Sequence, residues 1–177
     1  MLAALYAVAL EKYRLEEQLH FHASRDPLTH CFNRRALLTE VDRKINGKCG
    51  RNTLVGCFFV DIDEFKYIND RFGHETGDQV LVSVAEHLKQ AFRACSVIGR
   101  YGGDEFVGFC CFSNQHAYQA FVSRLEQRLS QVCQLNEYRV KASIGAACDT
   151  ACERSVLQQL IQQADVAMYQ NKRAKQI

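Results

Sequence analysis

The segment RYGGDEFVGF, residues 100–109, places two glycines and two acids directly before an apolar run. The flanking runs SVIGRY (96–101) and EFVGFCCF (105–112) have the length and composition of strands. Two glycines between such runs indicate a tight hairpin, because the favoured turns need positive φ angles. The sequence therefore predicts that Asp104 and Glu105 lie at the tip of a hairpin.

A second pair of acids ends another apolar run. The run LVGCFFVDI, residues 54–62, has strand length and stops at Asp61 and Asp63. If the two strands are neighbours, three or four carboxylates converge at one sheet edge, where they repel one another unless a cation compensates them. Oxygen ligands of this kind suit Mg²⁺ or Mn²⁺. Single acids are common at strand ends without any function, but two pairs ending two apolar strands favour a metal site.

The other segments predict helices that alternate with strands. The predicted helices span residues 33–45, 63–73, 75–92, 114–132 and 153–175, and a further strand spans 138–148. This order predicts an α/β (α+β) sandwich in which helices cover one face of a mainly antiparallel sheet.

Length and charge predict one domain with a short leading helix. The chain has 177 residues, of which residues 1–25 form the expected helix and residues 26–177 the domain, with the boundary beside Pro27. In the helix, Val8, Leu15 and Leu19 recur near heptad spacing, which fits a helix that packs against a second copy of itself. The alternative is that this helix is the stub of a larger upstream sensor region, which is membrane-attached. The 22 basic and 20 acidic residues form no long block of one sign, which argues against a nucleic-acid partner.

The cysteines predict reduced thiols and a cytoplasmic location. Nine cysteines are present, an odd number without paired C-x-x-C motifs, and Cys57, Cys110 and Cys111 lie in apolar runs where they act as small hydrophobes.

Phosphate chemistry is the natural use of the expected metal. Magnesium held by few carboxylates shares its ligand shell with substrate phosphates. A G-x-x-x-x-G-K-[ST] loop is absent from the sequence, which excludes a P-loop enzyme. A strand-end metal site instead suggests a polymerase-palm arrangement, in which Gly102 and Gly103 let the backbone approach a nucleotide.

The chain resembles the GGDEF-domain diguanylate cyclases in four ordered segments. These segments are GGDEF at 102–106, DPLTHCFNRR at 26–35 with Cys31 replacing a usual leucine, VDIDEFKYIND with FGHETGD across 60–78, and ADVAMYQNK at 164–172. The resemblance implies a nucleotide-cyclase-like GGDEF fold. It also implies that two GTP molecules condense to cyclic di-GMP and two pyrophosphates, at a site formed by two protomers of a homodimer.

The resemblance assigns roles at the acid edge. Asp61 and Asp104, with the backbone carbonyl of Ile62, are implied metal ligands, and Glu105 is expected to share both metal binding and the role of base with Asp104. Lys66 resembles the family's phosphate-binding lysine, which suits an α-phosphate gaining charge. Lys172 is the matching candidate at the triphosphate tail. Either Arg173 or Lys175 replaces a tail arginine of the family, or the phosphate contact of that arginine is lost.

The resemblance also implies a guanine pocket formed by Asn69, Asp78 and His74. A carboxylate accepts the paired N1–H and N2–H₂ donors of guanine, whereas adenine would leave Asp78 unpaired, so Asp78 favours GTP. The same residue also suits the start of a helix, where its charge meets the dipole, and both roles can hold. Phe65 is expected to lie in the core with partial contact to the nucleotide.

One departure from the family concerns product inhibition. The inhibitory site Arg-x-x-Asp is here Arg93-x-x-Ser96, and a serine lacks the charge that accepts two guanine donors, so weak or absent feedback inhibition is expected. The alternative to a cyclase is a catalytically silent module that binds GTP or cyclic di-GMP and signals through protein contacts. Degenerate members usually lose the signature acids, which this chain keeps.

Overall fold

The computed structural model describes residues 2–46, 53–92, 96–150 and 153–175. Within these ranges, five strands form one sheet in the order β1-β3-β4-β2-β7, and β1 and β3 are its parallel pair. The mainly antiparallel sheet predicted from the sequence is therefore confirmed. The strands are β1 (Phe32–Asn33), β2 (Leu54–Ile62), β3 (Val97–Arg100), β4 (Glu105–Phe112) and β7 (Ala142–Asp149).

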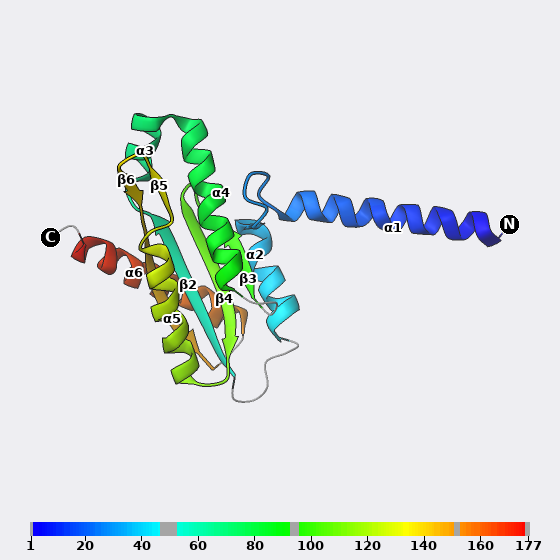
Figure 1. Cartoon of the computed structure of the whole chain (residues 1–177). Helices are drawn as coiled ribbons and strands as arrows, with labels where there is room; N and C mark the ends of the chain where they lie inside the picture. Colours follow the sequence, from blue (N-terminus) through cyan, green and yellow to red (C-terminus); the bar gives the residue numbers. More distant parts are fainter. Residues whose placement is uncertain (1, 47–52, 93–95, 151–152, 176–177) are drawn as a thin grey trace.

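Helices cover both faces of this sheet, so the expectation of a single covered face is wrong. One core cluster joins β2 to α4 (His74–Ala91) and α5 (Gln115–Leu129), and the other joins it to α2 (Arg34–Val41) and α6 (Arg154–Ala174). Figure 1 shows α4 and α5 on one side of the strands. The physical reason lies in β2, whose apolar run is continuous, as in strands buried on both faces, rather than alternating.

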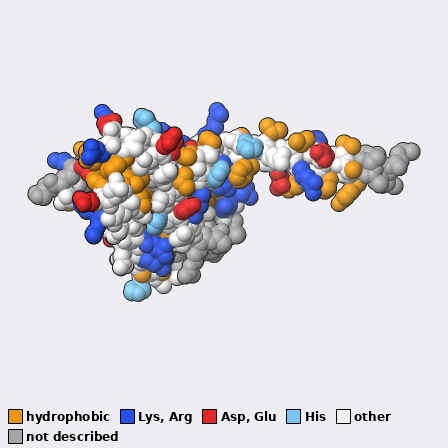
Figure 2. Space-filling view, turned by 45° about the horizontal axis from the view of Figure 1, so that its top comes forward, with side chains coloured by type: hydrophobic (Ala, Val, Ile, Leu, Met, Phe, Trp, Pro, Cys, Tyr) orange, Lys and Arg blue, Asp and Glu red, His pale blue; other side chains and the backbone are white. Residues whose placement is uncertain are grey.

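The leading helix α1 (Leu2–Ser24) projects away from the body of the molecule (Figure 1). Hydrophobic side chains lie along it in the space-filling view of Figure 2, and Tyr6, Val8 and Leu19 are each about 70% exposed. Among the described residues, no helix is both long enough and apolar enough to cross a membrane.

Two predicted elements differ from the structure. The strand expected over 138–148 is divided at Lys141: β6 (Tyr138–Val140) pairs with β5 (Cys133–Leu135) in a separate two-stranded sheet, and β7 continues into the main sheet. The helix expected over 33–45 leaves α-helical geometry at Val41 and continues as one π-helical turn, η1 (Asp42–Asn46). A short helix α3 (Phe65–Phe72) follows β2.

The hairpin between β3 and β4 is confirmed, but its glycines act differently from the prediction. Arg100 pairs with Phe106 across the hairpin, and the Tyr101 and Gly102 N–H groups both donate to the Glu105 carbonyl, at 2.7 and 3.3 Å. Neither Gly102 nor Gly103 has a positive φ angle. Among the described glycines, only Gly73 has one. Instead, a Cβ at Gly102 would lie 2.2 Å from Glu105 Oε2, so a side chain there would displace the end of the Glu105 side chain.

Candidate active site

The sheet register brings the two acid pairs to one edge. Asp61 on β2 lies directly opposite Glu105 on β4, and the Ile62 N–H donates to the Asp104 carbonyl at 3.3 Å. Side chains of directly opposed residues in an antiparallel pair lie on the same face, with Cβ atoms about 5 Å apart. The hairpin tip and the end of β2 thus form a single acidic edge, as the sequence predicts.

Two carboxylates of this acidic edge, Asp61 and Glu105, are costly to ionise. Burial raises the pKa of Asp61 above its ordinary value, the ion pair with Lys172 opposes this rise, and the charge of Asp104 adds to it. Burial, Asp61 and Asp104 likewise raise the pKa of Glu105. Both shifts have the physical cause that a bound cation would remove, namely negative charges held close together away from water.

Helix α6 supplies the positive charge at this edge. Lys172 forms an ion pair with Asp61 Oδ1. One turn further along, Lys175 Nζ lies 3.9 Å from Asp63 Oδ2, and Ser143 Oγ donates to Asp63 Oδ1 at 2.6 Å. Lys172 therefore reaches the acids, and its expected role at the triphosphate tail stays a prediction.

The acidic edge fits a hard divalent cation by its donor chemistry. Within the described ranges, no three His, Cys, Asp or Glu side chains gather in the geometry of a metal site. The edge nevertheless offers two opposed carboxylates, Asp61 and Glu105, next to the backbone at Ile62 and Asp104. Oxygen ligands whose pKa values are raised by burial and by neighbouring carboxylates are the set that Mg²⁺ or Mn²⁺ prefers and stabilises.

A second group of predicted residues lies where α3 meets α4. Asn69 on α3 packs against the first turns of α4, beside Asp78; a Cβ at Gly77 would lie 1.9 Å from Asn69 Oδ1. The chain turns between the two helices at Gly73, with φ 88°. Asp78 and His74 are exposed. The structure thus brings Asn69 against Gly77, the residue that precedes Asp78 in α4.

Helix α3 begins with Phe65 and Lys66, which follow Ile62 at the acidic edge by three and four residues. Lys66 is exposed, and Phe65 is half-buried and packs against the core cluster of α4 and α5, as expected for a core residue with one accessible side. Sequence reasoning missed the role of Gly77. Its signal was a glycine inside a helix-favouring segment, which often marks close approach of another group.

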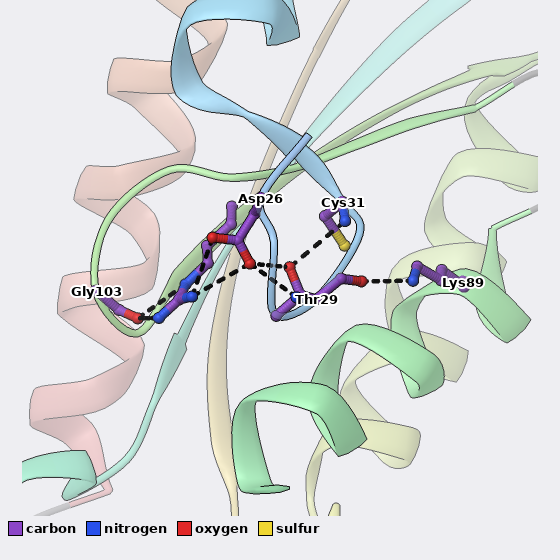
Figure 3. A network of polar contacts seen from close by, with 6 residues as sticks. Asp26, Thr29, Cys31, Lys89 and Gly103 are labelled. Atoms are coloured by element: carbon purple, nitrogen blue, oxygen red, sulfur yellow. Dashed lines mark hydrogen bonds and ion pairs between the residues drawn. The ribbon is translucent and has the colours of Figure 1, made fainter. Parts of the chain in front are cut away.

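A polar network holds the hairpin from outside the acidic edge (Figure 3). Arg100 Nε and Nη2 donate to the Gly103 carbonyl at 3.1 and 2.7 Å, and Arg100 Nη1 donates to both oxygens of Asp26. Thr29 donates its N–H and hydroxyl to Asp26 Oδ1, and Lys89 on α4 donates to the Thr29 carbonyl at 2.6 Å. The segment after α1 is therefore bonded to the backbone next to Asp104.

Sequence reasoning missed this network as well. Asp26 and Arg100 were recognised as parts of motifs, but they are separated by 74 positions, and their contact depends on the parallel pairing of β1 with β3. The available signal was an arginine two residues before Gly102 and an acid at a motif's start.

The expected inhibitory site is described in part. Arg93 lies outside the residues that the structure describes. Ser96 is half-buried and lines a cavity of about 330 Å³ together with Arg25, Lys44 and Lys89. The expectation of weak feedback inhibition stays a prediction.

Comparison with known proteins identifies the family. The family profile of the diguanylate cyclase GGDEF domain matches residues 23–176. The diguanylate cyclase DgcP of Escherichia coli is 32% identical over 186 residues, which cover 99% of this chain and 54% of DgcP. The cyclic di-GMP phosphodiesterase PdeR of the same organism is 33% identical over a span that covers 92% of this chain and 24% of PdeR. This chain thus spans about half, or less, of these relatives.

A solved structure agrees with the sequence comparison. The coiled coil and GGDEF domain of DgcB from Caulobacter crescentus, in complex with c-di-GMP, aligns with a TM-score of 0.78 and 28% identity over 97% of this chain and 94% of that one. The match includes the acidic edge and the α3–α4 contact, since both lie within the span of the family profile. The chain belongs to the GGDEF-domain diguanylate cyclase family.

Proposed function

We propose that this chain is an active diguanylate cyclase, which condenses two GTP molecules to cyclic di-GMP and two pyrophosphates. The observation that carries this proposal is the register of β2 and β4, which sets Asp61 opposite Glu105 with the Asp104 backbone bonded to Ile62. The sequence keeps all five letters of the signature at residues 102–106. A merely structural domain would have no use for acids whose ionised forms are destabilised by burial and by neighbouring carboxylates.

The acidic edge is the proposed reaction centre. The ribose 3′-oxygen of one GTP attacks the α-phosphate of the other, a P–O bond forms, and pyrophosphate leaves; the second bond forms in the same way. Asp104 and Glu105 accept the hydroxyl proton, and Lys66 stabilises the charge gained by the α-phosphate. Asp61, Asp104, Glu105 and the Ile62 carbonyl would hold Mg²⁺ or Mn²⁺, which neutralises phosphate charge and lowers the pKa of the hydroxyl.

The α3–α4 contact is the proposed guanine pocket. Asp78 would accept the N1–H and N2–H₂ donors of the base, and Asn69, fixed against Gly77, would bond another edge of the same ring. His74 would line this pocket and Phe65 would contact the nucleotide with its accessible side. At the other end of the substrate, Lys172 would bind the triphosphate tail, while Gly102 and Gly103 let the hairpin backbone approach the nucleotide.

Each protomer presents one GTP, so the productive state is a homodimer with two-fold symmetry. We assign dimerisation to residues 1–25, because α1 exposes Tyr6, Val8 and Leu19 to solvent, and catalysis to residues 26–177. A larger sensor region upstream is consistent with this division. GTP chemistry and the free thiols of Cys31, Cys57, Cys133 and Cys148 favour the cytoplasm.

The test is to incubate the purified chain with GTP and Mg²⁺ and to separate the nucleotides by chromatography, with Asp104→Ala in parallel. We expect cyclic di-GMP from the parent protein and none from the variant. No product at a protein concentration where dimers form would overturn the proposal and favour a silent module that binds GTP or cyclic di-GMP.

A further inference from the structure

The C-terminal end of α6 presents two lysines to two aspartates at the end of β2: Lys172 in its last turn and Lys175 as its C-cap. Lys172 pairs with Asp61, and Lys175, three positions later, lies 3.9 Å from Asp63. The first pair is the more enclosed: the Lys172 and Asp61 side chains are 26% and 14% exposed, whereas the Lys175 side chain is 50% exposed. The acidic edge therefore contains a cation of its own, placed on the carboxylate that also serves as a proposed metal ligand.

The helix that carries these lysines is firmly seated. At Gly145 on β7, a Cβ would lie 2.0 Å from the Ala164 carbonyl oxygen and 2.1 Å from the Met168 nitrogen, so backbone meets backbone there. Asn171 Nδ2, next to Lys172, donates to the Ile144 carbonyl at 2.9 Å. The backbone of α6 is thus held in place, and only the flexible lysine side chain is free to exchange Asp61 for another partner.

When a divalent cation binds at the acidic edge, it competes with the Lys172 ammonium for the Asp61 carboxylate. The Lys172 ammonium contacts Asp61 Oδ1, and it would repel a divalent cation bound to the same carboxylate, so the cation binds more tightly once the ammonium leaves. A nucleotide triphosphate offers that ammonium several new acceptor oxygens. We propose that Lys172 is a displaceable counter-ion that weakens metal binding at Asp61 until a nucleotide triphosphate draws it away.

The consequence is cooperative loading of metal and nucleotide. A ligand that removes the competitor of a second ligand raises the affinity for that second ligand, and the effect is reciprocal. This inference rests on the proposed function for the identity of the nucleotide, but the competition between Lys172 and the cation needs no nucleotide at all.

The experiment measures Mn²⁺ affinity directly, from the paramagnetic resonance signal of free Mn²⁺, without turnover. The variants are Lys172→Met, which removes the charge, and Lys172→Arg, which keeps it; Lys175→Met is the matched control from the same helix. Without nucleotide, we expect Lys172→Met to bind Mn²⁺ about fivefold more tightly or better, because even an exposed ion pair is worth up to about 1 kcal/mol. Lys172→Arg should stay within about twofold of the parent because it keeps the charge, and Lys175→Met should do so because the half-exposed Lys175 faces Asp63, at 3.9 Å, and not Asp61.

A non-hydrolysable GTP analogue provides the second measurement. It should raise the Mn²⁺ affinity of the parent protein strongly and that of Lys172→Met much less, since the competitor is already gone. Unchanged or weaker Mn²⁺ binding by Lys172→Met without nucleotide, in a variant that unfolds at the parent's temperature, would overturn the inference.

The two proposals fail separately. A parent protein that makes no cyclic di-GMP while Lys172→Met still tightens Mn²⁺ binding contradicts the cyclase proposal and supports the counter-ion. A parent that makes cyclic di-GMP while Lys172→Met leaves Mn²⁺ affinity unchanged contradicts the counter-ion alone.

Discussion

The Asp26–Arg100 pair offers the sharpest test of how the hairpin is held. Arg100 makes four hydrogen bonds, two to Asp26 and two to the Gly103 carbonyl, and Asp26 accepts two more from Thr29. The side chains of the pair are 18% and 17% exposed, so water replaces these bonds poorly. The perturbation is a double-mutant cycle of Asp26→Ala, Arg100→Ala and the double variant.

The expected energies follow from the bonds that each variant removes. Hydrogen bonds to charged groups contribute about 1.5–3 kcal/mol each when a partner is left unpaired, so either single variant should lower the free energy of unfolding by about 2–3 kcal/mol. The two costs should be similar, since each variant removes four hydrogen bonds: Asp26→Ala also releases Thr29, and Arg100→Ala also releases the Gly103 carbonyl. The two variants share the bonds that join them, and the coupling energy should be about 1–2 kcal/mol.

Activity should respond differently from stability. Arg100→Ala frees the carbonyl next to Asp104, and small misplacement of a reacting group costs up to about 100-fold in rate, so we expect product formation to fall at least tenfold. Asp26→Ala leaves the Arg100–Gly103 bonds in place and should reduce the rate less. The assays are urea unfolding and initial rates of cyclic di-GMP formation at saturating GTP.

Arg154→Ala is the control for loss of an arginine. Arg154 lies 3.7 Å from Asp42 and its side chain is 60% exposed, so the cost should stay below about 1 kcal/mol. Additive effects of Asp26→Ala and Arg100→Ala, or a normal rate for Arg100→Ala, would refute the reasoning that the network positions the hairpin.

Low pH should abolish the contribution of Asp26 to the free energy of unfolding. Burial alone would raise the pKa of Asp26, but the hydrogen bonds from Thr29 and Arg100 outweigh it and lower the pKa below its ordinary value. A carboxyl with a lowered pKa stabilises the fold fully above the unfolded pKa of about 3.9 and progressively less as the pH falls through the folded value. The stability difference between the parent and Asp26→Ala should therefore shrink as the pH falls below about 4.

Two glycine substitutions test close contacts, and a third serves as the control. Gly145→Ala should lower the free energy of unfolding by about 3 kcal/mol, because its Cβ meets α6 backbone at 2.0 Å. The control Gly103→Ala, with no atom within 4 Å of its Cβ, should cost less than about 1 kcal/mol, and equal urea midpoints for the two variants would contradict this reasoning. Gly77→Ala should displace only the end of the Asn69 side chain. We therefore expect the KM for GTP to rise about tenfold with a small change in the free energy of unfolding. An unchanged KM would argue against Asn69 as a guanine contact.

Much of the fold could be predicted because its signals are local. Apolar runs of strand length predicted β2 and the hairpin of β3 and β4, and helical periodicity predicted α4, α5 and α6. The strands β1 and β5, of two and three residues, escaped prediction, since such short pairings depend on partners distant in sequence. The covering of both sheet faces was also missed, although the continuous apolar run of β2 contained the information.

By itself, the sequence determined the four family segments and the placing of two acid pairs at the ends of two apolar strands, because composition and spacing are properties of neighbouring residues. Only the tertiary structure decided the register that sets Asp61 opposite Glu105, and the contacts of Asp26 with Arg100 and of Lys172 with Asp61, which join residues 74 and 111 positions apart. The physical reason is that such pairs form only after the sheet and the helices packed on it have fixed where each side chain can reach.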